Sequence, residues 1–127
     1  MSFIETVKRH IRCPLERVTV IENADDLDPA MIGTGVVFIL ATWSMPAIMA
    51  LKFYSDALES CTLTMPFWIL NQDALGAAVM ADLTAFPNRL GGNGESFFFR
   101  DGKQVDCLLR PDREAFIDKY RRAFALD

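Results

Sequence analysis

The sequence predicts a single α/β domain in which a mixed sheet of four or five strands lies between helices. Apolar runs of strand length alternate with segments of helical periodicity along the 127 residues. Near the C-terminus, two apolar runs flank Asp101-Gly102, a dipeptide that strongly favours a tight β-hairpin. Apolar residues make up 51% of the chain, enough for one core at this length. We therefore treat residues 1–127 as one domain with a three-layer α/β/α arrangement.

The N-terminal segment predicts an amphipathic helix over residues 2–12. Ser2 and Glu5 have the spacing of a capping box, in which a hydroxyl and a carboxylate satisfy the free amides of the first turn. The apolar residues that share one helical face are Phe3, Ile4, Val7 and Ile11. After Cys13-Pro14, residues 15–22 predict a short strand, and residues 23–32 predict a short helix that ends before Gly33.

The middle of the chain predicts a buried strand followed by two further helix–strand units. Residues 36–41 form an unbroken apolar run, typical of a central strand with parallel neighbours. Helical periodicity over residues 47–58 places Met49, Phe53 and Ala57 along one side. Residues 62–70 predict a strand, residues 73–83 a helix capped by Asp73, and residues 86–94 a glycine-rich loop.

The C-terminal segment predicts a hairpin and a last helix. The hairpin strands are residues 96–100 and 103–109, at one edge of the sheet. Phe98 faces the opposite side from Phe97 and Phe99, and helices on both faces bury all three. The last helix opens at Pro111-Asp112 and buries the aromatic stripe of Phe116, Tyr120 and Phe124.

Composition argues against several classes of function. The net charge of −4 does not suit a nucleic-acid-binding protein, and the basic residues near the C-terminus alternate with acids. No run of 18 apolar residues is present, and charges interrupt the N-terminus within its first residues, so we expect neither a membrane span nor a signal peptide, and a cytoplasmic location. The cysteines Cys13, Cys61 and Cys107 lack Cys-x-x-Cys spacing, and His10 is the only histidine, so we expect neither a metal site nor a cofactor.

From residue 15 onward, the order of elements resembles the thioredoxin fold with one helix, residues 2–12, added in front. Residues 36–43 resemble the central strand that leads into the family's Trp-Cys-Gly-Pro-Cys loop, written here Trp43-Ser44-Met45-Pro46-Ala47. The Asp101-Gly102 hairpin resembles the last two strands of that fold, and Arg89-Leu90-Gly91 resembles the turn before them.

The departures from the family pattern bear on chemistry. The resemblance places Ser44 at the attacking cysteine, Ala47 at the resolving cysteine and Phe38 at a buried carboxylate. It also calls for a cis-proline before the hairpin, yet no proline occurs between Pro87 and Pro111. Neither a hydroxyl nor a methyl group can form a disulfide. We therefore predict a redox-inactive, non-enzymatic member of the fold.

The strand-to-helix junction after residue 41 is the predicted functional site, since ligands tend to bind at the carboxyl edge of open α/β sheets. We predict a protein-binding surface there, with Trp43 and Met45 as apolar anchors. The predicted partner-binding residues are Trp43, Ser44, Met45, Pro46, Asn93 and Gly94. The competing interpretation is that Trp43 packs inward and the loop has no role in binding.

The predicted function is a non-catalytic, thioredoxin-like protein-binding module, such as an assembly chaperone, a subunit of a complex or an inhibitor. The alternative is an enzyme that binds a small molecule or a thiol such as glutathione, using Ser44 or a lone cysteine. The resemblance supports that alternative in one respect: a serine orients the thiol of glutathione in glutathione transferases, which share this fold. The identity of the partner and homo-oligomerisation stay open at this point.

Overall fold

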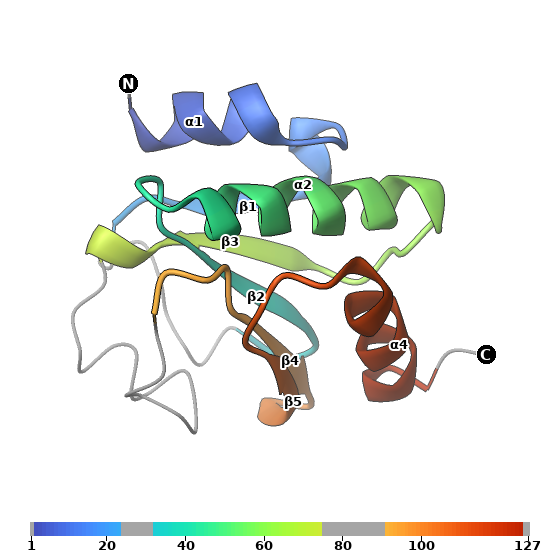
Figure 1. The fold of residues 1–127 in the computed structure, drawn as a ribbon. Helices are drawn as coiled ribbons and strands as arrows, with labels where there is room; N and C mark the ends of the chain where they lie inside the picture. The colour runs from blue at the N-terminus through green and yellow to red at the C-terminus, as the bar shows by residue number, and fades with distance from the viewer. Residues whose placement is uncertain (1, 24–31, 75–90, 126–127) are drawn as a thin grey trace.

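The computed structural model describes residues 2–23, 32–74 and 91–125. Its helices are α1 (Phe3–His10), α2 (Met45–Ser60) and α4 (Arg113–Ala123) (Figure 1). Its strands are β1 (Thr19–Ile21), β2 (Gly35–Leu40), β3 (Phe67–Asn71), β4 (Ser96–Arg100) and β5 (Lys103–Leu108). None of these helices is both long and apolar enough to cross a membrane.

The strands form one five-stranded mixed sheet in the order β1-β3-β2-β4-β5. β3 pairs in parallel with β1 and β2, whereas β4 pairs antiparallel with β2 and β5. Every residue of β2 is buried, as a strand in the middle of a covered sheet requires. The predicted central strand, the mixed sheet and the hairpin at its edge are therefore confirmed.

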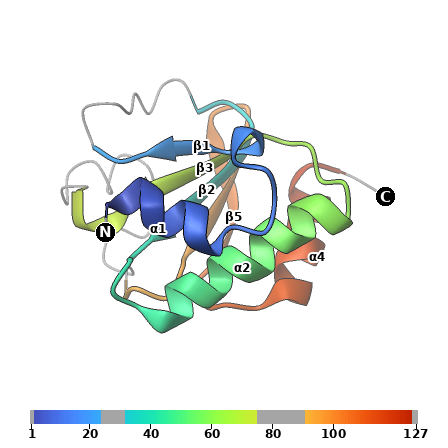
Figure 2. The ribbon, with the colours of Figure 1, turned by 90° about the horizontal axis from the view of Figure 1, so that it is seen from above.

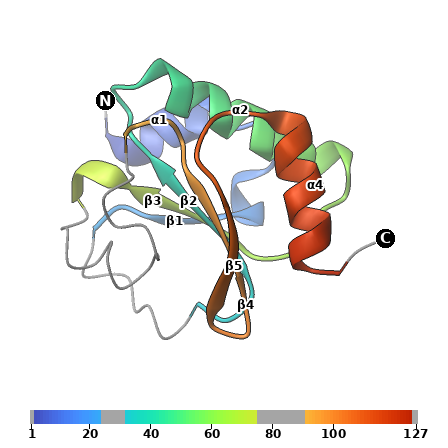
Figure 3. The same ribbon diagram turned by 60° about the horizontal axis from the view of Figure 1, so that its bottom comes forward.

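The β4–β5 hairpin runs along one edge of the sheet next to α4 (Figure 3). Its turn residues Asp101 and Gly102 have φ of 53° and 79°, the left-handed conformation that two-residue hairpin turns require. Phe98 lies in the core under α2 and α4, and Phe97 and Phe99 lie in a second cluster on the opposite face. All three are buried, as predicted.

The three described helices lie on the same face of the sheet, with α1 beside α2 (Figure 2). Aromatic rings join α2 to α4, because Tyr54 stacks on Phe116 at a centroid distance of 4.2 Å. The Tyr54 hydroxyl donates to the carbonyl of Arg110 at 3.2 Å and accepts from the amide of Asp112 at 3.3 Å. The stripe of Phe116, Tyr120 and Phe124 is buried, as predicted.

The added helix α1 is attached firmly to α2. Ser2 caps α1 by accepting from the amide of Glu5 at 3.2 Å, which confirms the predicted N-cap. Phe3 and Val7 are buried in the core that α2 shares. Beyond the helix, the amide of Arg12 donates to the buried hydroxyl of Ser55 at 2.9 Å. These contacts fix the polar face of α1 relative to α2.

Three element boundaries differ from the sequence prediction. The predicted strand 15–22 is shorter, because Leu15–Arg17 forms a 3-10 turn after Pro14 and only Thr19–Ile21 pairs with β3. The predicted strand 62–70 begins at Phe67, because Thr62 adopts a left-handed φ of 53° at the end of α2. α2 itself begins at Met45, with Pro46 in its first turn, where proline is well tolerated.

Met49, Phe53 and Ala57 follow one another at four-residue spacing on α2, as predicted, but this side of the helix is not uniformly buried. Met49 is 43% exposed and Ala57 is buried, and the buried residues of α2 also include Leu51, Tyr54 and Leu58. Residues 24–31 of the predicted helix 23–32, residues 75–83 of the predicted helix 73–83, and residues 86–90 lie outside the described residues. Within the described part, Gln72–Ala74 forms a 3-10 turn. The helices expected on the second face of the sheet therefore stay a prediction.

Candidate functional site

Three large apolar side chains lie exposed where β2 leads into α2. The exposed fractions are 64% for Trp43, 68% for Met45 and 43% for Met49. Met45 and Met49 are four residues apart on α2, so they lie on the same helical face. We call these three residues the Trp43 patch. Most of the Trp43 side chain is thus exposed, and the competing interpretation, a partly inward Trp43 in a loop without a binding role, stays untested.

The indole of Trp43 is held in place from two sides although it is exposed. Its Nε1 donates to the Oδ1 carboxylate oxygen of Asp73 at 3.0 Å. Its ring lies so close to Gly92 that a β-carbon there would be 2.6 Å from the ring carbon Cη2. Gly92 also has a left-handed φ of 75°. Trp43 is thus an exposed but oriented aromatic surface, which loses little side-chain freedom when something binds to it.

Ser44, by contrast, is buried, with 8% of its surface exposed. Its amide donates to the carbonyl of Ala41 at 3.1 Å, and its hydroxyl donates to the carbonyl of Gly92. Because the hydroxyl points to Gly92, it makes no capping hydrogen bond to the first turn of α2. The hydroxyl proton is thus used inside the protein rather than offered to a ligand.

The loop before β4 faces α2, as predicted, but its glycines serve packing within the chain. Gly94 is buried, and a β-carbon on it would lie 2.5 Å from Cβ of Ala50 and 3.1 Å from Cα of Ala47. Asn93 is half-buried beside it. Trp43 and α2 therefore occupy the space beside Gly92 and Gly94. Of the six predicted site residues, Trp43, Met45 and Pro46 are exposed.

The loop also contains a buried carboxylate that the sequence analysis did not single out. Glu95 is fully buried, and its Oε2 accepts from the amide of Gly91 at 2.6 Å. Its backbone carbonyl accepts from the amide of Ile39, which attaches the loop to β2. Oε1 of Glu95 has no hydrogen-bond partner among residues 2–23, 32–74 and 91–125. Glu95 thus holds the loop opposite Ser44 from inside the fold.

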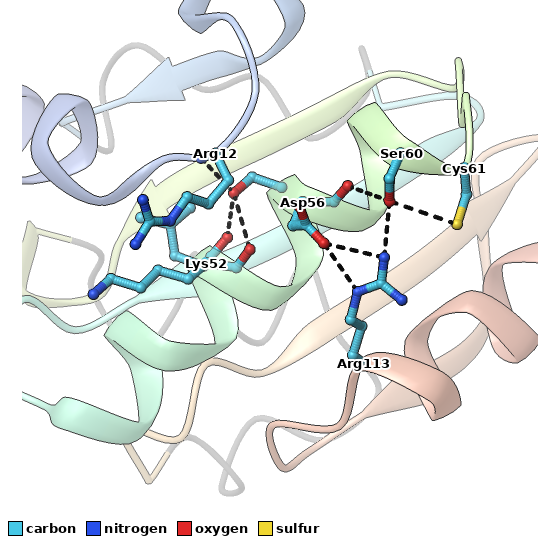
Figure 4. A network of polar contacts seen from close by, with 8 residues as sticks. Arg12, Lys52, Asp56, Ser60, Cys61 and Arg113 are labelled. Carbon is cyan, nitrogen blue, oxygen red and sulfur yellow. Dashed lines mark hydrogen bonds and ion pairs between the residues drawn. The ribbon is translucent and has the colours of Figure 1, made fainter.

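Two of the three thiols, Cys13 and Cys107, have surroundings that disfavour the thiolate. Burial raises the pKa of Cys13, and burial together with the nearby Asp106 carboxylate raises the pKa of Cys107. Cys61 is half-buried at the end of α2, with its Sγ 3.9 Å from the Ser60 hydroxyl (Figure 4). A raised pKa lowers the thiolate fraction at neutral pH and so the reactivity of the thiol. The described residues include no cluster of three or more His, Cys, Asp or Glu side chains able to hold a metal.

A basic hollow of about 360 Å³ adjoins the Trp43 patch, between α1 and the start of α2. The sequence analysis did not predict it, because its cationic residues come from two helices. Arg9 and His10 lie on α1 and Lys52 on α2. The other residues that line the hollow are Thr6, Thr42, Trp43, Ser44, Met45 and Ile48. Trp43 and Met45 thus belong to both the patch and the hollow.

The hollow has a positive electrostatic potential although the whole chain is acidic. Desolvation and the positive charges of Lys52, Arg9 and Arg12 lower the pKa of His10. Figure 4 shows the side chains of Arg12 and Lys52 pointing away from Asp56, whose carboxylate pairs instead with Arg113 of α4 at 3.1 Å. The first turn of α2 carries no acidic residue, so the positive end of the helix dipole adds to this potential.

Comparison of the chain with known proteins gives similarity in structure but not in sequence. No protein-family model matches the sequence, and no curated protein matches it. Among solved structures, thioredoxin from Malassezia sympodialis superposes with a TM-score of 0.62 at 18% identity, covering 84% of this chain and 90% of that one. Thioredoxin from Plasmodium falciparum gives a TM-score of 0.55 at 17% identity, covering 83% and 97%.

A third similar chain comes from work on the thiol-resolving mechanism of yeast mitochondrial 1-Cys peroxiredoxin through glutathione and thioredoxin systems. It superposes with a TM-score of 0.61 at 15% identity, covering 83% of this chain and 94% of that one. At such identities the similarity concerns the fold alone, because one fold serves many functions. The five-stranded sheet, its topology and these superpositions together show that the chain has a thioredoxin-like α/β fold with a helix, α1, before its first strand.

Proposed function

We propose that the chain is a non-catalytic module that binds another protein through the Trp43 patch. The observation that carries this proposal is the exposure of one tryptophan and two methionines where β2 leads into α2. Trp and Met are enriched in the buried parts of protein interfaces, and exposing them together without a partner costs solubility. The orientation of Trp43 by Asp73 and Gly92 adds to the case, since a preoriented anchor binds at a lower entropic cost.

Observations on Ser44, Ala47 and two of the cysteines support the non-catalytic part of the proposal. Ser44 and Ala47 stand where the resemblance to thioredoxin calls for two cysteines. The Ser44 proton is donated to Gly92, so this hydroxyl does not have a proton free to orient a thiolate. The raised pKa of Cys13 and of Cys107 disfavours their thiolates. These observations favour the binding module over the thiol-binding enzyme that the sequence left as an alternative.

The test is affinity capture from the native cell with the wild-type chain and with Trp43→Ala, each protein in the captured set being quantified. Truncation of a central aromatic anchor costs about 2 kcal/mol, so the captured partner should fall by roughly 30-fold in affinity. Because Trp43 is 64% exposed, the circular dichroism spectrum and the unfolding midpoint should change little. Val105→Ala is the matched control, since Val105 is 43% exposed on β5, outside the patch. Equal capture by Trp43→Ala and wild type would place the interface elsewhere.

A further inference from the structure

The partner's chemistry can be inferred from the basic hollow beside the Trp43 patch, and this inference rests on the proposed function. We infer that the hollow between α1 and the start of α2 receives a carboxylate of an acidic peptide segment whose neighbouring apolar side chain lies on the Trp43 patch. The occupant is thus an acidic and apolar segment of a partner protein, rather than a free cofactor.

The position of the hollow gives the first argument. Trp43 and Met45 line it and also belong to the patch, so a side chain resting on them places the adjacent residues of the same chain at its mouth. Its volume of about 360 Å³ is at the low end of the roughly 300–1,000 Å³ typical of small-molecule sites. That space suits one or two side chains of a peptide that continues over the surface.

Charge complementarity gives the second argument. Arg9 and Lys52 line the hollow, and neither takes part in the ion pairs found among the described residues, which join Arg113 to Asp56, Lys119 to Asp106 and Arg122 to Asp118. The one carboxylate of α1, Glu5, is exposed in its first turn, and Asp56 on α2 is turned to Arg113. The Asp73 carboxylate accepts from the indole of Trp43, and among the described residues no ion pair joins it to Arg9 or Lys52. An acidic segment would therefore supply a carboxylate to these two cationic groups.

The lining of the hollow is both cationic and apolar, so it suits a carboxylate together with the apolar stem of the same side chain. Thr42 and Ile48 lie on its wall, whereas the hydroxyl of Thr6 donates to the carbonyl of Ser2 within α1. A carboxylate can accept hydrogen bonds from guanidinium, ammonium and hydroxyl groups together. A basic segment would be repelled by the positive charges of Arg9 and Lys52, which line the hollow. The geometry therefore discriminates between acidic and basic partners.

The experiment is selection of random peptides displayed on phage against the immobilised full chain. Fluorescence anisotropy then measures the selected peptides and their isosteric Asp→Asn and Glu→Gln versions. We expect the enriched peptides to carry Asp or Glu within a few residues of an aromatic or aliphatic residue. The Arg9→Gln/Lys52→Gln double variant should bind them about three- to tenfold more weakly and should lose most of the salt dependence. Lys8→Gln is the matched control, with a charge change on the exposed face of α1 outside the hollow.

His10 provides a second readout that a merely structural role of Arg9 and Lys52 would not produce. As the only histidine, it gives one assignable set of imidazole signals in NMR. A bound carboxylate favours the imidazolium, so the pKa of His10 should rise when a selected acidic peptide binds, and should not rise with the isosteric amide peptide. Enrichment of neutral or basic peptides, no enrichment, or an unchanged pKa of His10 in the complex would each overturn the inference.

The two proposals fail in different ways. If Trp43→Ala weakens binding and Arg9→Gln/Lys52→Gln does not, the patch binds a partner but the hollow takes no carboxylate. If the double variant weakens binding of the acidic peptide and Trp43→Ala does not, the hollow binds carboxylates and the Trp43 patch is not the interface.

Discussion

Replacement of Gly94 by alanine tests the packing that holds the loop against α2. Gly94 has a φ of 72°, in the left-handed region, and a β-carbon there would lie 2.5 Å from Cβ of Ala50 and 3.1 Å from Cα of Ala47. Neither neighbour is the end of a flexible side chain, so the loop or the helix has to move. Left-handed backbone costs an L-residue about 1–2 kcal/mol, and overpacking adds about 1–3 kcal/mol. We expect Gly94→Ala to lower the free energy of unfolding by about 2–5 kcal/mol.

Two other glycines separate the backbone cost from the steric cost. Gly102→Ala changes a residue with a φ of 79° but no atom within 4 Å of the new β-carbon, so it should cost about 1–2 kcal/mol. Gly33→Ala has neither a left-handed φ nor a neighbour within 4 Å, so it should be close to neutral. Urea unfolding followed by circular dichroism measures all three. Equal losses for Gly94→Ala and Gly102→Ala would refute the packing argument.

Three further predictions concern chemistry and electrostatics. The chain should not accelerate the reduction of insulin by dithiothreitol beyond the rate seen with serum albumin, because Ser44 and Ala47 lack thiols. An acceleration that Cys61→Ser abolishes would contradict this prediction. Burial raises the pKa of Tyr54 to about 12, so the folded state holds more protons than the unfolded state between about pH 10 and 12. The free energy of unfolding should therefore fall by about 2–3 kcal/mol as the pH rises through this range, and the fall should be smaller in Tyr54→Phe. The pKa of His10, measured by NMR in the free protein, should lie below its ordinary value of 6.5, and it should rise in Lys52→Gln, which removes a nearby positive charge. An unchanged pKa in the variant would refute the contribution of Lys52 to the positive charge at the hollow.

The added helix α1 supplies one wall of the hollow in which we propose that a carboxylate binds. α1 packs Phe3 and Val7 into the core and brings Arg9 and His10 to the start of α2. A thioredoxin-like sheet with α2 alone would present Lys52 and the end of a helix dipole, without a wall on the other side. Its firm attachment through Ser55 gives the hollow a fixed shape. We regard α1 as part of the proposed binding site rather than as a peripheral extension.

Features that depend on neighbouring residues in the sequence were predicted accurately. The Asp101-Gly102 turn, the Ser2 cap, the buried strand β2 and the aromatic stripe of α4 all follow from local backbone preferences or from a regular apolar period. The length of β1 was not predicted well, because pairing with β3 rather than β-propensity decides which residues join a sheet.

The sequence by itself determined the fold class and the residue types at Ser44 and Ala47, because turn chemistry, periodicity and residue identity are local properties. Only the tertiary structure decided which side chains meet at the edge of the sheet. In that structure the Ser44 hydroxyl donates to the carbonyl of Gly92, and Gly94 packs against α2. Trp43 and Met45 remain exposed. The tertiary structure also joined Arg9 of α1 to Lys52 of α2 around one hollow. Residues far apart along the chain come together only through the packing of the core, and no local pattern in the sequence records that packing.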